Sequence, residues 1–334
     1  MEKKRIIWAD SLKGWLMILV IVGHAIQTIM NEGCSNDHVF NLIYSFHMPA
    51  FMAVSGWFAY RSNRIGGGYL SACKRRSYQV LVPYFVWSLL RWFLSGCQPD
   101  RLALIITNPD SYFWFLWILF WICVIFIGCQ WIADKLKIDE LFPVGTACVV
   151  LMGTMVALEF RLFGFQFLSY YFLFYTLGYC IHRFEVLQLK NNFIIVVLIM
   201  VWAFLAWEWT MHGLPSWIPA IPQVPDTLLQ YAYRGLSALI GVMVLIGIAP
   251  KLLNGNSRFN YWMKDIGVVS LGLYVVHLTF MGYIKELLFT LTPNISTWCA
   301  ISILSLVSFF VSIIIVNLLN KNRWTSRICL GKVF

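Results

Sequence analysis

The sequence predicts an all-α polytopic membrane helix bundle of about ten transmembrane helices, with the N- and C-termini in the cytoplasm. Three observations support this prediction. Of the 334 residues, 60% are hydrophobic and only 12% are charged, whereas about a quarter of a soluble domain is charged. A soluble fold could not cover so much apolar surface, so a lipid bilayer is the expected partner. The basic residues also gather in short segments between apolar runs.

Ten apolar segments approach the length of about 20 residues that a transmembrane helix needs. They lie near residues 12–30, 39–60, 78–96, 112–133, 141–158, 162–181, 193–211, 228–249, 266–289 and 297–319. The fifth and sixth are the closest together, because only residues 159–161 separate them. We expect one membrane-embedded domain over residues 1–334, without a soluble domain or an internal repeat.

The first segment has one alternative interpretation, a cleaved signal peptide, because the basic residues up to Arg5 precede an apolar run. No small-residue cleavage site follows, however. Asp10, Lys13 and His24 are also unusual for the hydrophobic part of a signal peptide. We therefore predict that this segment is the first transmembrane helix.

The positions of Lys and Arg orient the bundle. With the N-terminus inside, twenty of the 25 basic residues fall on the inner side. They are Lys3, Lys4, Arg5, Lys13, Arg61, Arg64, Lys74, Arg75, Arg76, Lys135, Lys137, Arg183, Lys190, Lys251, Arg258, Lys264, Lys321, Arg323, Arg327 and Lys332. The outer connections hold Arg101 and Arg161. This asymmetry predicts a multi-pass protein of the inner (plasma) membrane, and it accounts for the net charge of +10 without a nucleic-acid partner.

The nine cysteines form no C-x-x-C pair and no Cys/His spacing typical of a metal site, so no metal is expected. Most of them lie inside apolar runs, where a free cysteine behaves as a small hydrophobic residue. Cys34 and Cys97 both fall in predicted outer loops. A disulfide between these two residues is therefore left open.

Six ionisable residues lie inside predicted spans, where a central charge costs at least ~2.5–3.5 kcal/mol. They are His24, His47, Arg91, Glu208, Arg234 and His277. At a rise of 1.5 Å per residue, their depths all come out at about 16–22 Å from the inner face. This common depth predicts a polar chamber near the midplane. The alternative is that each residue only satisfies a neighbouring helix, as a pair of Glu208 with Arg234 would.

Several motifs recur in order along the chain. The first span contains DSLKGWLMILVIVGHA, in which Asp10 and Lys13 share a helix face and His24 follows Lys13 after ten residues. Further segments read FHMPAFMAVSGWFAYR, KRRSYQVLVPYFVW, WFLWIL and SLGLYVVHLTF. In this order they resemble the acyltransferase-3 family of integral membrane acyltransferases. The D-x-L-K-G and G-H-A motifs resemble those of its fucose 4-O-acetylase-like branch, although many members of the family have Arg at the position of Lys13.

The resemblance implies transfer of an acetyl or other short acyl group from cytoplasmic acyl-CoA to a hydroxyl of a cell-surface glycan or glycolipid precursor. The expected partners are acetyl-CoA, as the acyl donor substrate, and a saccharide acceptor, which is a polysaccharide, an oligosaccharide or a lipid-linked sugar. A homodimer is left open. Because an alcohol is a weak nucleophile at neutral pH, it needs a base, and His is suited to that role.

The candidate residues follow from this expectation. His24 is the candidate base, with Asp10 and Lys13 as further catalytic candidates. The candidates for substrate binding are His47, Arg91, Glu208, Arg234, Tyr274 and His277, and Arg234 is also a candidate for stabilising an oxyanion. Lys74, Arg75 and Arg76 are candidates for holding the donor phosphates, because Arg suits phosphate, although inner loops are basic in any case.

Two other functions are compatible with the same residues. A transporter would use the polar layer as a substrate site at the midplane, but the sequence shows no paired interrupted helices in two similar halves. A passive lipid- or glycan-binding subunit is the third alternative. It predicts that function does not depend on His24.

Overall fold

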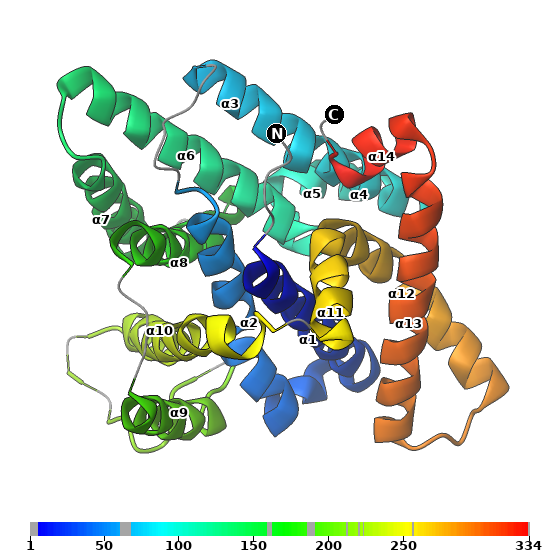
Figure 1. The fold of residues 1–334 in the computed structure, drawn as a ribbon. Coiled ribbons are helices and arrows are strands. Elements are labelled where there is room, and N and C mark those ends of the chain that lie inside the picture. The colour runs from blue at the N-terminus through cyan, green and yellow to red at the C-terminus, as the bar shows by residue number, and fades with distance from the viewer. Residues whose placement is uncertain are drawn as a thin grey trace.

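The computed structural model describes residues 6–60, 68–158, 162–185, 191–211, 213–219, 221–222, 224–255 and 257–332. These residues form a helical bundle and no β-strand, which confirms the all-α prediction (Figure 1). The helices are α1 (Ile7–Met30), η1 (Asn31–Asn36), α2 (His38–Trp57), α3 (Tyr69–Arg76), η2 (Ser77–Leu81), α4 (Val82–Leu94), α5 (Pro99–Thr107), η3 (Pro109–Ser111), α6 (Trp114–Leu136), α7 (Leu141–Leu158), η4 (Leu162–Gly164), α8 (Phe165–Phe184), α9 (Asn192–Trp207), α10 (Asp226–Leu252), α11 (Arg258–Val268), α12 (Ser270–Leu291), α13 (Thr297–Asn320) and α14 (Arg323–Leu330).

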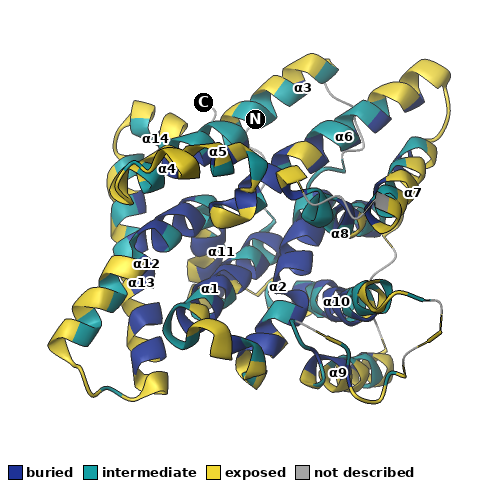
Figure 2. Cartoon of the chain, turned by 180° about the vertical axis from the view of Figure 1, so that it is seen from behind, coloured by how far each residue is buried: buried dark blue, intermediate teal, exposed yellow. Residues whose placement is uncertain are grey.

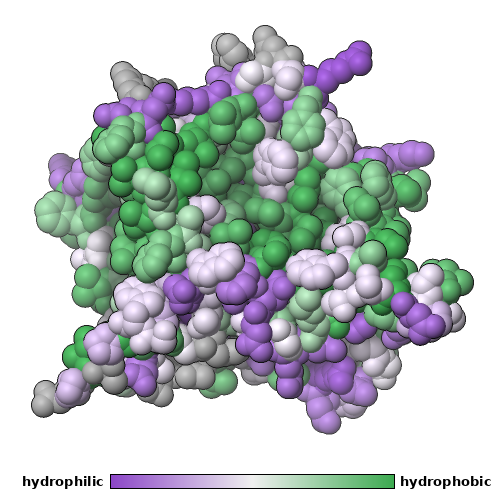
Figure 3. Space-filling view, turned by 90° about the horizontal axis from the view of Figure 1, so that it is seen from below, coloured by the Kyte–Doolittle hydropathy of each residue, from purple (hydrophilic) through white to green (hydrophobic). Residues whose placement is uncertain are grey.

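A helix lies at each of the ten predicted spans, and five helical segments among the described residues are long and apolar enough to cross a membrane. These five are Ile7–Asn36, Trp114–Leu136, Asp226–Leu252, Ser270–Leu291 and Thr297–Asn320. Apolar side chains cover much of the face drawn in Figure 3, and polar side chains border it. The protein is therefore a multi-pass membrane protein, and the crossing of the other five helices stays a prediction.

The two ends of the chain project at the same edge of the molecule in Figure 1, as an even number of crossings requires. The assignment of this edge to the cytoplasm rests on the basic residues. Several of those lie outside the described residues, namely Lys3, Lys4, Arg5, Arg61, Arg64, Arg161 and Lys190. All nine cysteines are free thiols, so a disulfide between Cys34 and Cys97 is absent and that alternative was wrong.

The third span begins well before the predicted residue 78. Helix α3 runs through the π-helical turn η2 directly into α4. The turn has a local cause, because Pro83 has no N–H to give to the carbonyl of Gln79 and the regular α-helical bond is lost. Because the residues KRRSYQ in this extension are polar, hydropathy does not predict it as part of the span. As a result, Arg75 and Arg76 lie on a helix rather than in a loop.

The ninth predicted span is two elements rather than one. Helix α11 ends at Val268, and α12 begins at Ser270. Helix α11 packs closely along α1, because two glycines let the backbones meet. A Cβ atom at Gly267 would lie 1.8 Å from the Asp10 carbonyl oxygen, and one at Gly14 would lie 2.2 Å from the Met263 carbonyl oxygen. Helix α11 thus braces the turn of α1 that carries Asp10 and Lys13.

Helices α2 and α8 meet in the same way, through small residues that permit close backbone approach in membranes. A Cβ atom at Gly56 would lie 1.8 Å from the Tyr175 carbonyl oxygen, and one at Gly178 would lie 1.7 Å from the Ala53 carbonyl oxygen. The most deeply buried residues gather where α1, α2 and α12 run through the centre of the bundle (Figure 2). This centre holds the polar residues described below.

Replacement of Gly178 by Ala should destabilise the protein, because the new methyl group forces α8 away from α2. Overpacking of this kind costs about 1–3 kcal/mol. We expect a lower thermal unfolding midpoint in detergent for Gly178→Ala. Gly128→Ala is the matched control, since a Cβ atom at Gly128 of α6 meets nothing within 4 Å. Equal midpoints for both variants would contradict the close packing of α2 against α8.

Candidate active site

One face of α1 carries the sequence motif. The Lys13 ammonium pairs with the Asp10 carboxylate, with Nζ and Oδ1 2.8 Å apart. The same ammonium lies 4.3 Å from the centre of the Phe58 ring, at the end of α2. Residues Lys13, Met17, Val20 and His24 follow one another at three- and four-residue spacing, so they point to the same side of the helix. This face leads from the Asp10–Lys13 pair to His24.

His24 meets His277 from α12, with 5.4 Å between the centres of the two imidazole rings. Tyr274 lies one turn before His277 on the same helix, and its ring centre is 6.0 Å from that of His277. His47 of α2 contacts Tyr44, with ring centres 4.8 Å apart. The structure therefore brings His24, His277 and the tyrosine of the ninth-span motif together, and His47 lies within electrostatic reach of His24.

Hydrogen bonds fix the tautomers of two histidines. His277 Nδ1 lies 2.7 Å from the Leu273 carbonyl oxygen, and His47 Nδ1 lies 2.6 Å from that of Ile43. A carbonyl oxygen can only accept, so in the neutral rings Nδ1 carries the proton and Nε2 carries the lone pair. His277 Nε2 and the Tyr274 hydroxyl are buried and have no hydrogen-bond partner among the described residues. His277 Nε2, on the ring next to His24, is thus available to a ligand.

His24 is held more loosely than the other two histidines. Its Nδ1 lies 3.4 Å from Oε1 of Gln27, which also accepts a hydrogen bond from the Tyr44 hydroxyl at 3.3 Å. Donation from Nδ1–H to Gln27 leaves the Nε2 lone pair of His24 free to take a proton. Gln27 contacts His24, and Tyr44 contacts Gln27; neither residue was singled out from the sequence. A polar residue one turn beyond a candidate base is the signal that could have found Gln27.

Arg91 of α4 completes this cluster. Its guanidinium lies within electrostatic reach of His24, Tyr274 and His277. It is half-buried, and no ion pair or hydrogen bond is found for it within the described part of the chain. The Arg91 guanidinium lies near two histidines, and no carboxylate is found to neutralise it within the described residues. Such a group is suited to stabilising negative charge on a reacting oxygen.

An apolar cavity of about 160 Å³ extends from this cluster toward the inner side. Lys13 lies at its inner end, and Tyr274 lies near the histidines. Its walls come from α1, α2, α6 and α12, and the apolar side chains among them are Met17, Val20, Met48, Phe51, Phe115, Leu119 and Leu271. The cavity therefore extends from Lys13 to Tyr274, which is the neighbour of His277.

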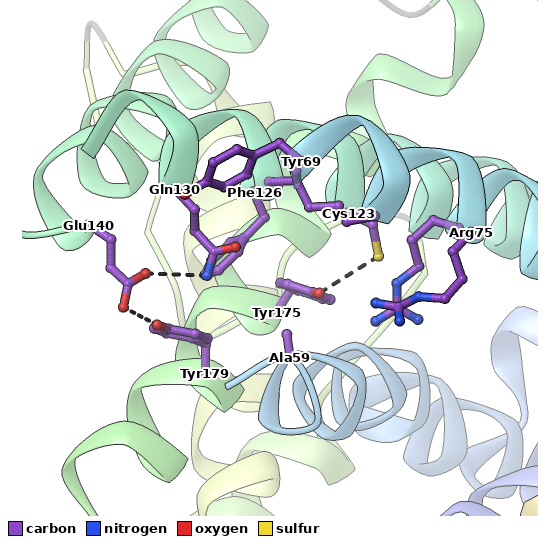
Figure 4. Close-up of a pocket in the computed structure, with 12 residues that line it drawn as sticks. Ala59, Tyr69, Arg75, Cys123, Phe126, Gln130, Glu140, Tyr175 and Tyr179 are labelled. Carbon is purple, nitrogen blue, oxygen red and sulfur yellow. Dashed lines mark hydrogen bonds between the residues drawn. The ribbon is translucent and has the colours of Figure 1, made fainter. Parts of the chain in front are cut away.

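A second pocket, of about 70 Å³, lies between α3, α6 and α8 (Figure 4). Arg75 and Arg76 line it, whereas Lys74 is exposed and does not. Arg76 donates a hydrogen bond from Nη1 to Oε1 of Gln79, at 3.1 Å. Within the same pocket the Cys123 thiol and the Tyr175 hydroxyl are 3.7 Å apart. Of the three residues expected to bind phosphate, the structure thus brings the two arginines to one pocket.

The two cavities are neighbours along the bundle. In α6, Leu119 lines the apolar cavity, and Cys123, one turn later, lines the basic pocket. Ser55, near the end of α2, lines the apolar cavity, and Ala59, just after α2 ends at Trp57, lines the basic pocket. Residues four apart in a helix lie one above the other. The two cavities thus follow one another along α6, and Tyr274, which lines the apolar cavity, is the neighbour of His277; we call this succession from the arginines to the histidines the route.

Arg234 and Glu208 lie apart from this route. The Arg234 guanidinium donates to the Thr210 carbonyl oxygen at 3.1 Å and lies 5.3 Å from the Trp209 ring centre. Glu208 follows the last residue of α9 and forms no ion pair with Arg234, so the pairing considered from the sequence is not made. Within the described residues no group of three metal-binding side chains is found.

The comparisons with known proteins identify the family. A family model described as "Acyltransferase domain", of the acyltransferase-3 family, matches residues 6–317. The nodulation protein NolL of Mesorhizobium japonicum is 31% identical over 121 residues, which are 33% of this chain and 32% of the relative. NolL of Sinorhizobium fredii is 37% identical over 119 residues, 32% of each chain. The alignments thus span about a third of each relative, and no solved structure matches.

Proposed function

This chain belongs to the acyltransferase-3 family, and we propose that it is a membrane O-acyltransferase that moves an acetyl or other short acyl group from acyl-CoA to a saccharide hydroxyl. One observation carries the proposal: a basic inner pocket and an apolar cavity follow one another along α6, and Tyr274 at the wall of that cavity neighbours the His24–His277 pair. This sequence of environments fits a donor that has phosphates, a narrow arm and a thioester; the amides and hydroxyl of that arm can meet Lys13, Ser55 and Ser270 in the cavity wall. A transporter would not require this sequence of environments.

In the proposed donor site, Arg75 and Arg76 bind the phosphates of acetyl-CoA. The arm of the donor runs through the apolar cavity past Lys13, which Asp10 holds in place. His24 lies eleven positions after Lys13, a rise of roughly 16 Å along α1. The reactive thioester then lies beside the His24–His277 pair, while the nucleotide stays at the cytoplasmic surface of the inner membrane.

In the proposed reaction, His24 Nε2 removes the proton from the acceptor hydroxyl while the hydroxyl oxygen attacks the thioester carbon. Negative charge develops on the carbonyl oxygen, which Arg91 and the Tyr274 hydroxyl stabilise. The C–S bond then breaks, and His24 returns the proton to the departing thiolate. The products are an O-acyl ester and a free thiol, and His24 ends in its starting form.

The acceptor approaches from the opposite, outer side in this proposal. His47 and His277 line its path, and Arg234 and Glu208 contribute from α9 and α10. The acceptor classes are a polysaccharide, an oligosaccharide or a lipid-linked sugar of the cell envelope. Acetylation of such a molecule would modify the cell surface.

The direct test uses purified protein in liposomes with acetyl-labelled acetyl-CoA and a panel of these acceptors. The proposal expects label on the saccharide, in an ester bond that mild alkali cleaves, together with one free thiol per acetyl group transferred. Uptake of a saccharide across the bilayer without release of thiol would replace the enzyme by the transporter. Binding without either event would favour a passive subunit.

Neutralisation of the inner arginines gives a separate prediction. The double variant Arg75→Gln, Arg76→Gln should raise the KM for acetyl-CoA and leave kcat at saturation nearly unchanged, because uniform binding is lost. Lys74→Gln is the matched control, since it removes a neighbouring charge outside the pocket. Steady-state kinetics at varied acetyl-CoA measure both values. An equal rise in KM for both proteins would mean that only the general basicity of this segment matters.

A further inference from the structure

We propose that the end of the inner pocket formed by Gln130, Glu140 and Tyr179 recognises the adenine base of the donor. This inference rests on the proposed function, because it assigns a further part of the same donor to the same pocket. It concerns the part of the pocket that lies away from Arg75 and Arg76, to which the proposed function assigns no role. We call these three residues the acceptor end of the pocket.

The pocket is divided by charge. Arg75 lies at one side in Figure 4, and Glu140 lies at the opposite side. Aromatic rings occupy the region between them: the centre of the Phe126 ring is 5.3 Å from that of Tyr175 and 4.7 Å from that of Tyr179. A ligand that fills this pocket therefore needs an anionic part, a flat or apolar part, and hydrogen-bond donors at its far end.

The acceptor end is held by its own hydrogen bonds. The Tyr179 hydroxyl donates to Oε1 of Glu140, and Gln130 donates from Nε2 to Oε2 of Glu140 at 3.2 Å. Because both donors are directed at the carboxylate, the remaining oxygen of Gln130 is an acceptor. Glu140 is buried, and Arg183 offsets its charge with Nη1 3.3 Å from Oε1. This end therefore presents the Gln130 amide oxygen as an acceptor in a fixed geometry.

Adenine fits these requirements. Its exocyclic amine is a donor, and glutamine is a well-known partner of the amine edge of adenine. Its ring is flat and can lie against the aromatic side chains. An oxopurine has a carbonyl oxygen in place of that amine, which would face acceptors and leave them unpaired. The acceptor end is thus expected to prefer adenine to hypoxanthine.

The order of the residues along α6 also matches the order of the donor's parts. Leu119 lines the apolar cavity, Cys123 lies beside Arg76, and Gln130 lies about two turns further toward the inner end. This order is arm, phosphates, base. The same order in acetyl-CoA places the base at the acceptor end when the thioester lies beside His24.

The kinetic test compares acetyl-CoA with acetyl-4′-phosphopantetheine, which has the same thioester and arm but no adenosine. Gln130→Leu should raise the KM for acetyl-CoA roughly three- to tenfold, as expected for one hydrogen bond. The KM for acetyl-4′-phosphopantetheine should not change. Gln98→Leu, the same substitution on the exposed Gln98 that follows α4, is the control and should change neither value. An equal rise for both donors would overturn the assignment.

A binding test uses wild-type protein in detergent and does not depend on turnover or on the folding of a variant. Calorimetry should show tighter binding of adenosine 3′,5′-bisphosphate than of inosine 3′,5′-bisphosphate, and equal affinities would overturn the base site. Discrimination between the two nucleotides without any acetyl transfer would support the base site and reject the proposed enzyme. Transfer without discrimination would support the enzyme and reject the base site.

Discussion

His24→Ala should lower kcat for acetyl transfer by roughly 10²–10⁴-fold, which is the usual contribution of a general base. The affinity for acetyl-CoA should change little, because Arg75 and Arg76 lie at the other end of the route. The structure supports this expectation, since His24 lies one turn beyond Val20 of the cavity wall and meets His277. Initial rates at saturating donor and acceptor measure the effect.

His24→Gln separates chemistry from structure at the same position. Glutamine can still hydrogen-bond to Gln27 or to a neighbouring helix, but it cannot take a proton at neutral pH. The general-base role therefore predicts that Gln is nearly as damaging as Ala, in protein that remains monodisperse. Turnover close to wild type for His24→Gln would make His24 a structural residue and transfer the role of base to His277 or His47.

The helical architecture could be predicted from the sequence because lipid exposure leaves a strong hydropathy signal. Every predicted span holds a helix. The errors concern segments that are helical but polar on one side. Helix α11 escaped notice because only one face of it packs on α1, and α3 was hidden by its basic residues. Neither segment is apolar enough to be read as a span.

The candidate site could be predicted only in part. Depth along a helix axis can be estimated from the rise per residue, so His24 and His277 were correctly expected at one level. Rotation about each axis and the packing of neighbours cannot be read in this way. Arg234 and Glu208 therefore have the same depth as His24 when it is estimated from the sequence. They nevertheless lie on the α9–α10 side of the bundle, where Arg234 contacts Thr210 and Trp209.

The acceptor end of the inner pocket could not be predicted for another reason. Glu140 and Gln130 lie near the basic inner segment, where a single polar or acidic residue is ordinary and carries no signal. Only the structure shows that Tyr179, from a different helix, bonds to Glu140 and that Arg183 pairs with it. The role of such residues depends on contacts between helices that are distant in the sequence.

His277→Gln should lower kcat by roughly 10²-fold, because it removes a lone pair that is fixed beside His24. The bond from His277 Nδ1–H to the Leu273 carbonyl leaves Nε2 able only to accept. It can therefore orient either the acceptor hydroxyl or protonated His24, and both belong to the same proton transfer. His38→Gln, on an exposed histidine stacked on Trp207, is the control and should leave kcat unchanged.

The double variant His24→Gln, His277→Gln decides whether the two histidines act together. Residues that serve one step are strongly non-additive, so the double variant should be no slower than the slower single variant. Independent structural damage would instead multiply the two losses. The comparison uses kcat at saturating acetyl-CoA, with nucleotide affinity measured in parallel to show that the inner pocket is intact. A multiplicative loss would place His277 in the packing of α12 against α1 and leave His24 to carry the proton without it.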